Sequence, residues 1–257
     1  MKIAAIYDIH ANPYALEAVL EEIKKCNVDL IIVGGDVVAG PMPNETLTLL
    51  QNAPVRMKFI LGNAESEVLR HLNGEKINGL SERADEEARW VSKQLKDEHK
   101  DWIRSWEKTI ILDTINFGRI LFCHGTPRSN VEIFTSLTPK EKLISIFKNV
   151  TVSNVVCGHT HMQFERKIDN IHIVNAGSVG MPFGGTGAYW LLIDNSFEFR
   201  RTEYDLKATS QNISKSNYPY AESFASNNIL TVPSENDALK MLTKIELDYE
   251  KTAHNNS

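Results

Sequence analysis

Residues 3–36 read IAAIYDIHANPYALEAVLEEIKKCNVDLIIVGGD, and the order of elements in this segment indicates the fold class. Its first apolar run, 3–7, is typical of a buried strand. Asn12 offers an N-cap, and apolar residues at helical spacing predict a helix over 13–25. A second apolar run, 28–33, predicts another strand. Strand, helix and strand in this order predict an α/β fold with parallel pairing at its start.

The pattern continues along the chain. A short helix is expected at 45–51, followed by a strand at 55–61. Residues 64–108 are charged and helical in pattern, which predicts a helical insert whose tryptophans pack in a core. Strand signals return at 109–112, 119–123, 154–157, 171–174 and 189–193, with a possible edge strand at 198–204.

The C-terminal part changes character after this strand-rich region. Residues 206–233 are polar and low in periodicity, and no element is predicted there. Residues 234–251 predict an amphipathic terminal helix. We therefore expect one domain over residues 1–205, with its insert at about 64–108, and a C-terminal extension over 206–257.

Composition excludes several classes of protein. With 28 basic against 33 acidic residues, the formal net charge is -5, which gives no reason to expect a nucleic-acid partner. An anionic substrate would need local positive charge, which bound metal ions could supply. No apolar run approaches the ~20 residues of a membrane span. The three cysteines are widely spaced, so we expect reduced thiols and a cytoplasmic location. Because a membrane span is lacking, we expect no membrane partner. The sequence leaves the oligomeric state open.

Five short motifs carry the candidate chemistry, and each stands at the end of an apolar strand-like run. Ligands of α/β sheets bind beyond the carboxyl ends of the strands, so we expect these motifs to meet at one edge. The motifs are Asp8-Ile9-His10, Gly35-Asp36, Gly62-Asn63, Cys123-His124-Gly125 and Gly158-His159-Thr160-His161.

Seven side chains in these motifs are candidate metal ligands. Two Asp, one Asn and four His suit Mn, Fe, Zn or Ni better than Ca or Mg. Seven ligands exceed what one open site needs, and they suit two sites that share a carboxylate. Two ions roughly 3.5–4 Å apart can hold a phosphoryl group and lower the pKa of water. The candidates are Asp8, His10, Asp36, Asn63, His124, His159 and His161.

Each motif alone has a plainer interpretation. A single His at a strand end is usually structural, and Gly-Asn is a common turn pair. The joint arrangement favours a site, because four of the eight histidines fall in these motifs. The segment 175–180 is either a tight turn or a close approach to the same edge. The remaining histidines, expected as non-ligands, are His71, His99, His172 and His254.

The ordered set D-x-H, G-D, G-N, H and G-H-x-H resembles the calcineurin-like metallophosphoesterase family over about residues 1–205. Asn175 to Gly180, followed by Met181-Pro182, resembles its small phosphodiesterase branch. The helical insert resembles the diadenosine tetraphosphatase-like members. The resemblance implies a four-layer α/β/β/α sandwich and a metal-dependent phosphoesterase, either a phosphodiesterase or a dinucleoside polyphosphate hydrolase.

The resemblance also assigns ligands by position. Two divalent ions are implied, Mn foremost, with Fe, Zn or Ni as alternatives. Asp36 would bridge them, Asn63 would also touch the substrate phosphate, and a water activated by the metals would be the nucleophile. One ion would be held by Asp8, His10, Asp36 and His161, and the other by Asp36, Asn63, His124 and His159.

One position departs from the family pattern. Members often carry a histidine after Gly-Asn that is thought to protonate the leaving group, whereas this chain has Ala64. General acid catalysis is typically worth ~10²–10⁴-fold, so we expect substrates whose leaving group needs little protonation, such as nucleoside polyphosphates, aryl esters and some diesters. Glu65 keeps its place and could favour the start of the next helix. His71 of the insert is a candidate replacement donor.

Two other functions stay open at this stage. A catalytically weakened scaffold of the same fold is one, because Ala64 is a step in that direction. A regulator that binds nucleotide without turnover is the other. The seven intact candidate ligands favour an enzyme acting on a small phosphorylated substrate, possibly a nucleotide, because a scaffold has no chemical need for them.

Overall fold

The computed structural model describes residues 1–75 and 81–255, and only the backbone for 248–255. The strands are β1 (Ile3–Ile6), β2 (Leu30–Val33), β3 (Met57–Phe59), β4 (Thr109–Thr114), β5 (Gly118–Cys123), β6 (Asn154–Cys157), β7 (Gln163–Ile168), β8 (Ile171–Ala176), β9 (Ala188–Ile193) and β10 (Phe197–Thr202). The helices are α1 (Pro13–Lys25), α2 (Pro43–Asn52), α3 (Asn63–Leu72), α4 (Glu82–Gln94), α5 (Asp97–Arg104), α6 (Lys140–Phe147), α7 (Leu206–Ser214), α8 (Ala221–Phe224), the π-helix η1 (Ala225–Leu230) and α9 (Glu235–Asn255).

The described strands form two five-stranded sheets. The first has the order β10-β9-β1-β2-β3, and β1, β2 and β3 run parallel, with Ile3 opposite Leu30 and Ile6 opposite Val33. The second has the order β4-β5-β6-β8-β7, and β5, β6 and β8 run parallel. The expected parallel start is confirmed. Antiparallel strands form one edge of the first sheet, at β9 and β10, and both edges of the second, at β4 and β7.

Alternation along the strands explains how the sheets stack. Ile3 and Ala5 face the other sheet and join a core cluster with Phe122, whereas Ala4 and Ile6 face the opposite way, toward α1. Successive side chains on a strand point to opposite faces, so one strand serves two cores. Each fully buried Ile or Leu contributes about 1.5–3 kcal/mol before entropy is counted.

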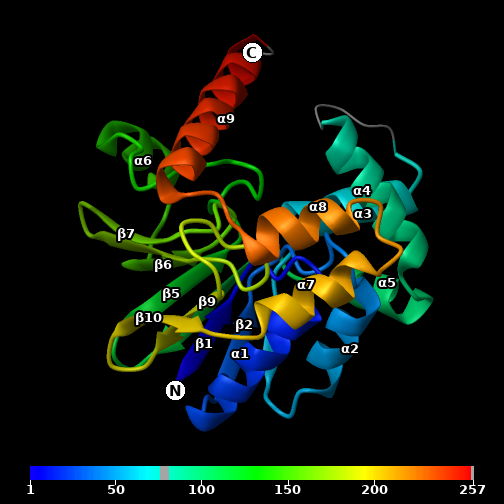
Figure 1. Ribbon diagram of the computed structural model, residues 1–257. Helices are drawn as coiled ribbons and strands as arrows, with labels where there is room; N and C mark the ends of the chain where they lie inside the picture. Colours follow the sequence, from blue (N-terminus) through cyan, green and yellow to red (C-terminus); the bar gives the residue numbers. More distant parts are fainter. Residues whose placement is uncertain (76–80, 256–257) are drawn as a thin grey trace.

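Helices complete the layers. α1 and α2 cover the outer face of the first sheet through the cluster that contains Leu16 and Leu47, and α6 covers the second sheet through Leu143 (Figure 1). The expected four-layer α/β/β/α sandwich is therefore confirmed. α1 begins as expected, because Asn12 Oδ1 accepts a hydrogen bond from Ala15 N at 3.2 Å and Pro13 occupies the first turn.

Several elements were not expected from the sequence. α6 and β7 lie in stretches without a clear periodic signal, and the polar segment 206–233 folds into α7, α8 and η1. Asp205 caps α7 by accepting from Ala208 N at 2.9 Å. Ile213 and Phe224 are buried in a cluster that also contacts Trp90 of α4. Tertiary burial, rather than local periodicity, therefore sets this region.

The insert and the extension contact each other. Tyr218 and Tyr220 donate hydrogen bonds to Glu87 and Glu86 of α4, and Arg83 lies 4.4 Å from the centre of the Tyr220 ring. In Figure 1, α3, α4 and α5 lie on one side of the molecule, and α9 rises on the other side, next to α6. The division into a domain over 1–205 and an extension over 206–257 stays a prediction.

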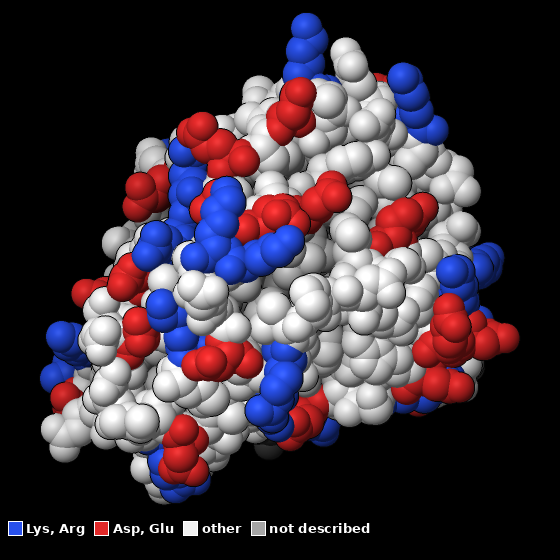
Figure 2. Space-filling model, turned by 90° about the horizontal axis from the view of Figure 1, so that it is seen from below, with Lys and Arg blue, Asp and Glu red and all other residues white. Residues whose placement is uncertain are grey.

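Two further findings concern membrane-spanning helices and surface charge. Among the described residues, no helix has the length and apolar character needed to cross a bilayer. Figure 2 shows Lys and Arg interspersed with Asp and Glu on one face of the molecule.

Candidate metal centre

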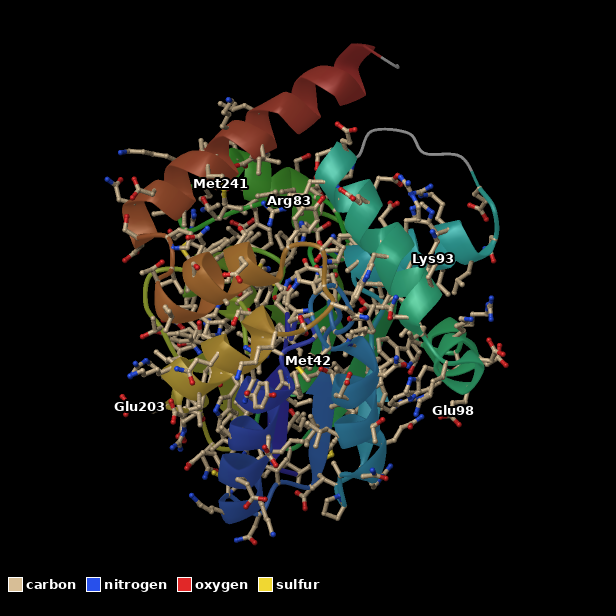
Figure 3. The ribbon with its side chains drawn as sticks, turned by 45° about the vertical axis from the view of Figure 1, so that its right-hand side comes forward. Met42, Arg83, Lys93, Glu98, Glu203 and Met241 are labelled. Atoms are coloured by element: carbon tan, nitrogen blue, oxygen red, sulfur yellow. The ribbon has the colours of Figure 1, made fainter. Side chains whose placement is uncertain are left out.

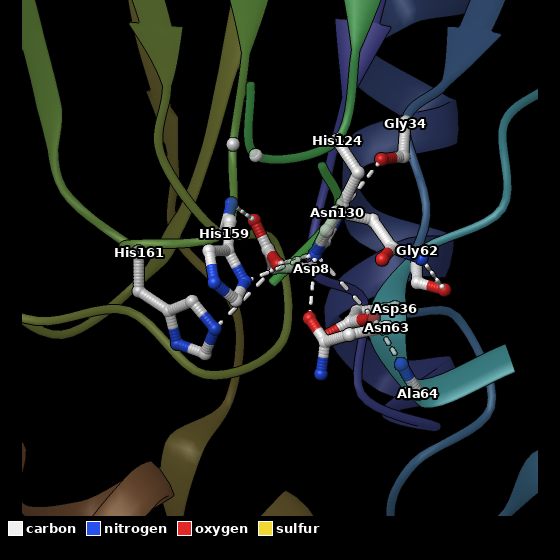
Figure 4. A network of polar contacts seen from close by, with 12 residues as sticks. Asp8, Gly34, Asp36, Gly62, Asn63, Ala64, His124, Asn130, His159 and His161 are labelled. Atoms are coloured by element: carbon white, nitrogen blue, oxygen red, sulfur yellow. Dashed lines mark hydrogen bonds and ion pairs between the residues drawn. The ribbon is translucent and has the colours of Figure 1, made fainter. Parts of the chain in front are cut away.

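Five strand ends deliver the candidate ligands to one place. β1 leads to Asp8, β2 to Asp36 and β3 to Asn63, while β5 and β6 of the other sheet lead to His124 and the 158–161 loop. Backbone contacts join the two sheets there: Asp8 Oδ2 accepts from His159 N at 2.8 Å, and His124 Nδ1 lies 2.9 Å from Gly34 O (Figure 4). All seven side chains predicted from the sequence therefore lie in one cluster.

The first group consists of Asp8, His10 and His161. Its three ligand atoms lie within 4.8 Å of one another. His10 Nε2 is 3.1 Å from His161 Nε2, which in turn is 3.5 Å from Asp8 Oδ1. Two ligands bound at about 2.0–2.1 Å to one ion lie at a comparable spacing. The group is buried, so a bound ion would be largely shielded from water.

The second group consists of Asp36, His124 and His159, again within 4.8 Å. His124 Nε2 is 3.2 Å from His159 Nδ1 and 3.5 Å from Asp36 Oδ1. Asn63 joins this group, because its Oδ1 is 3.0 Å from His124 Nε2. Carboxylate, imidazole and amide oxygen thus converge here as in the predicted second site.

Asp36 faces both groups. Its Oδ1 is directed at His124, and its Oδ2 is 4.0 Å from His10 Nε2 in the first group. Ala64 N donates to Oδ1 at 2.8 Å and helps to hold the carboxylate in this orientation. A carboxylate with one oxygen toward each group has the geometry of a bridging ligand.

Backbone carbonyls fix the ring nitrogens of three histidines. Nδ1 of His10 lies 3.0 Å from Ala39 O, Nδ1 of His161 lies 2.7 Å from Met181 O, and Nδ1 of His124 faces Gly34 O. A carbonyl can only accept, so each Nδ1 carries the proton and each Nε2 presents a lone pair. Lone pairs of His10 and His161 that face each other at 3.1 Å repel unless a cation lies between them. This is the arrangement of metal-binding histidines.

An unsatisfied oxygen gives an independent test of fit. Asp8 Oδ1 is buried and has no hydrogen-bond partner among the described residues. Leaving a buried carboxylate oxygen unpaired is costly, and a cation beside it removes that cost. The residues present therefore fit a bound divalent metal.

The backbone at the site is strained. Five of the seven candidates have positive φ, a region that non-glycine residues rarely adopt and that often marks functional sites. The values are 52° for Asp8, 49° for His10, 51° for Asp36, 70° for His159 and 59° for His161.

Two glycines allow the close approach of these loops. A Cβ at Gly62 would lie 2.1 Å from Asp36 Oδ1, and one at Gly158 would lie 2.5 Å from Asp8 Oδ2. Both contacts are too short for any larger residue, so the glycines are needed to seat the two carboxylates.

Burial favours the neutral form of two of the histidines, His159 and His161. It lowers the pKa of His159 to about 4, with the neighbouring His124 adding to the effect, and it holds the pKa of His161 well below its usual value. Burial raises the pKa of Asp8, and repulsion from Asp36 adds to this rise. Neutral imidazoles are the form that binds metal.

Glu65 does more than favour the start of α3. Its buried carboxylate accepts four backbone N–H groups: Asp36 at 2.8 Å, Val37 at 2.8 Å, Val38 at 3.1 Å and Gly62 at 2.9 Å. It thereby ties the loop after β2 to the loop after β3. The signal in the sequence was its place after the Gly-Asn pair.

Two asparagines support the other loops. Asn175 donates to Gly158 O at 2.7 Å and to Thr160 Oγ1 at 3.0 Å, which orients the loop carrying His159 and His161. The segment 175–180 is thus both a turn and a close support of the site. Asn130 donates to Gly62 O at 2.9 Å and to Ser66 Oγ at 2.8 Å (Figure 4). No sequence motif pointed to Asn130.

The described histidines outside the motifs contact residues that are not candidate ligands. His71 Nε2 lies 2.8 Å from Asp85 Oδ1 of α4, roughly 12 Å along α3 from Asn63. It is engaged within the insert, which gives no support to its role as a replacement proton donor. His99 Nδ1 contacts Asn44 at 2.9 Å, and His172 pairs with Glu165 at 2.9 Å. The side chain of His254 is outside the described residues.

A family model described as the calcineurin-like phosphoesterase superfamily domain matches residues 1–196. The chain belongs to this superfamily. The resemblance seen in the motifs is therefore confirmed, and the metal-ligand groups lie within the matched segment. The superfamily assignment supports a phosphoesterase and leaves the substrate open.

Individual relatives agree with this assignment. An uncharacterised protein of Methanocaldococcus jannaschii is 30% identical over 237 residues, which cover 84% of this chain and 93% of that protein. A metallophosphoesterase from Sphaerobacter thermophilus has a similar structure, with a TM-score of 0.70, 25% identity, and coverage of 90% of this chain and 98% of that chain. A hypothetical protein from Pyrococcus horikoshii has a TM-score of 0.75 at 18% identity, covering 87% and 97%, and this similarity concerns the fold.

Proposed function

We propose that the chain is a dinuclear metal-dependent phosphohydrolase that cleaves a phosphodiester or a nucleoside polyphosphate. The observation that carries the proposal is Asp36, whose two oxygens face two separate groups of ligands. The lone pairs of His10, His161 and His124 face inward around it. A purely structural cluster would not require three histidines with the same protonated nitrogen turned outward.

The bound ions and the residues of the site would have different roles in the reaction. Two bound divalent ions would supply Lewis acidity, a water of lowered pKa and a net positive charge, since Asp8 and Asp36 neutralise only two of their four charges. Asn63 would hold the second ion and also touch the substrate phosphate. The neutral imidazoles leave the positive charge of the site undiminished for an anionic substrate. Glu65 and Asn175 keep the ligand loops in position.

The native metal and the setting are part of the proposal. The mixed nitrogen and oxygen ligands suit Mn, Fe, Zn or Ni, and the family resemblance is our reason for placing Mn first. We expect a small phosphorylated substrate, such as a nucleotide, and no nucleic-acid or membrane partner. The cytoplasmic location stays a prediction. The three cysteines of the chain are free thiols, as that prediction requires.

The proposal is tested by hydrolysis of bis(p-nitrophenyl) phosphate by the Mn-loaded protein. We expect Mn-dependent turnover in the wild type. Asp36→Asn should lower the rate by at least about 100-fold, because supporting residues of metal ligands alone are worth about 10–100-fold.

A matched control separates the site from general damage. Asp169 also has positive φ, at 47°, but it lies in the β7–β8 turn, paired with Lys140 at 3.5 Å. Asp169→Asn should therefore retain wild-type turnover. No hydrolysis by the Mn-loaded wild type, with the ester recovered intact, would contradict the proposal and favour the scaffold or the nucleotide-binding regulator.

A further inference from the structure

A cavity adjoins the candidate metal centre at His124. Its volume is about 310 Å³, which is in the range of small-ligand sites. His124 lines it from the side of the centre, and Ser66 of α3, Lys108 before β4 and the 126–130 loop form its other walls. Asn130 also lines the cavity and bonds Gly62 and Ser66, on either side of the candidate ligand Asn63. A substrate held at the centre could therefore extend into this cavity.

The cavity is cationic on a chain that is acidic overall. Lys108 and Arg128 both line it. Within the described part of the chain, the Lys108 ammonium group has no hydrogen-bond or ion-pair partner, because the adjacent Glu107 faces Lys58 at 3.6 Å. Lys108 is exposed and can therefore move to a ligand.

Arg128 is held in a fixed position. Its Nε donates to Glu132 Oε2 at 2.9 Å, and a second guanidinium nitrogen bonds Oε1. Glu132 is buried and also accepts from Thr126 at 2.8 Å. Lys108 and Arg128 both line the cavity, and the one carboxylate paired with Arg128 leaves a net positive charge there.

Ser129 adds a hydroxyl donor. Its Oγ accepts from Val131 N at 3.3 Å and from Glu132 N at 3.2 Å. Those bonds use its lone pairs, so the O–H hydrogen is available to an acceptor in the cavity. A mobile ammonium, a fixed guanidinium and a hydroxyl donor are suited to the several acceptor oxygens of a phosphate.

We propose that this cavity binds a second phosphate group carried by the leaving group, so that the preferred substrate is a nucleoside polyphosphate rather than a simple diester. The inference rests on the proposed function for the position of the first phosphate. It assigns Lys108 as a specificity-determining residue, with Arg128 and Ser129 completing the subsite.

Lys108→Ala is the variant that tests the assignment. Its side chain is exposed, so the substitution should not disturb folding. Lys93→Ala is the matched control, because Lys93 is an exposed lysine on α4 that does not line the cavity (Figure 3). Calorimetric titration of inorganic tripolyphosphate into metal-free protein should give binding about 10-fold weaker for Lys108→Ala than for the wild type or Lys93→Ala.

Kinetics of the Mn-loaded protein supply the second measurement. Lys108→Ala should raise KM for ADP about 10-fold and leave KM for bis(p-nitrophenyl) phosphate unchanged. Equal tripolyphosphate binding by wild type and variant, including no binding by either, would overturn the assignment, as would an equal change in both KM values. Failure of the proposed function would appear differently, as absence of turnover by the wild type on both substrates.

Discussion

At the scale of single residues, the candidate ligands occupy backbone conformations that the chain would otherwise avoid. Asp8, His10, Asp36, His159 and His161 all have φ between 49° and 70°. Such residues persist only where surrounding contacts hold them, and here the contacts are those of Glu65, Asn175 and the backbone carbonyls that bond the imidazoles. Strain concentrated on five of the seven candidate ligands is typical of a functional site, where geometry is kept at a cost in stability.

The prediction at the residue scale concerns Ala64 and the choice of leaving group. Its methyl group cannot protonate a leaving group, and His71 is bonded to Asp85 in the insert. We expect the Mn-loaded protein to hydrolyse p-nitrophenyl phosphate at least about 100-fold faster than an alkyl phosphate monoester, because only the alkyl leaving group needs a proton donor. Ala64→His should narrow that ratio by raising the alkyl rate.

A second substitution at this position controls for its size. Ala64→Leu adds bulk without a proton donor, so the aryl-to-alkyl ratio should stay at the wild-type value. Equal turnover of the aryl and alkyl esters by the wild type would refute the role assigned to Ala64.

The seven candidate ligands were predictable from the sequence, whereas the contacts that hold their loops in place were not. The seven candidates follow strand ends, and parallel strands bring their carboxyl ends to one edge, so their meeting follows from local pattern. Their role as metal ligands stays a prediction. The bonds of Glu65 to the 36–38 backbone span 27 to 29 positions, and Asn130 reaches Gly62 across 68. Contacts at such separations depend on the complete fold.

At the scale of elements, the helix α9 packs against the candidate metal centre from outside the matched family segment. Phe183 stacks on His161 with ring centroids 4.9 Å apart and an interplanar angle of 29°. Phe183 and Met162 pack in one cluster with Ala238 and Leu242 of α9. The terminal helix was predictable from its amphipathic pattern, whereas its contact with the His161 loop was not, because no local signal encodes the partner of an apolar face.

Leu242→Ala tests this support. Leu242 is buried, and its truncation should loosen Phe183 and Met162 and weaken Mn binding, by less than the about 10–100-fold that follows loss of a direct hydrogen-bonding partner of a ligand. Met241→Ala is the control, because Met241 is an adjacent but exposed residue of α9 (Figure 3). Mn affinity by calorimetry that is equal in both variants would contradict the coupling.

At the scale of the whole molecule, the sandwich serves to bring two sheets' strand ends together. β1, β2 and β3 supply Asp8, Asp36 and Asn63 from one sheet, while β5 and β6 of the other lead to the histidines at 124, 159 and 161. Neither sheet alone holds a complete group, since Asp8 pairs with His161 and Asp36 with His124. The fold class was predictable from the alternation of apolar runs, but α6, β7 and the 206–230 helices were not, because burial rather than period defines them.

Anomalous diffraction from a crystal of the Mn-loaded protein tests the dinuclear centre most directly. We expect two Mn peaks roughly 3.5–4 Å apart, with Asp36 between them. One peak should lie within about 2.0–2.3 Å of the ligand atoms of Asp8, His10 and His161, and the other at the same distance from His124 and His159. A single peak, or peaks away from these side chains, would contradict it.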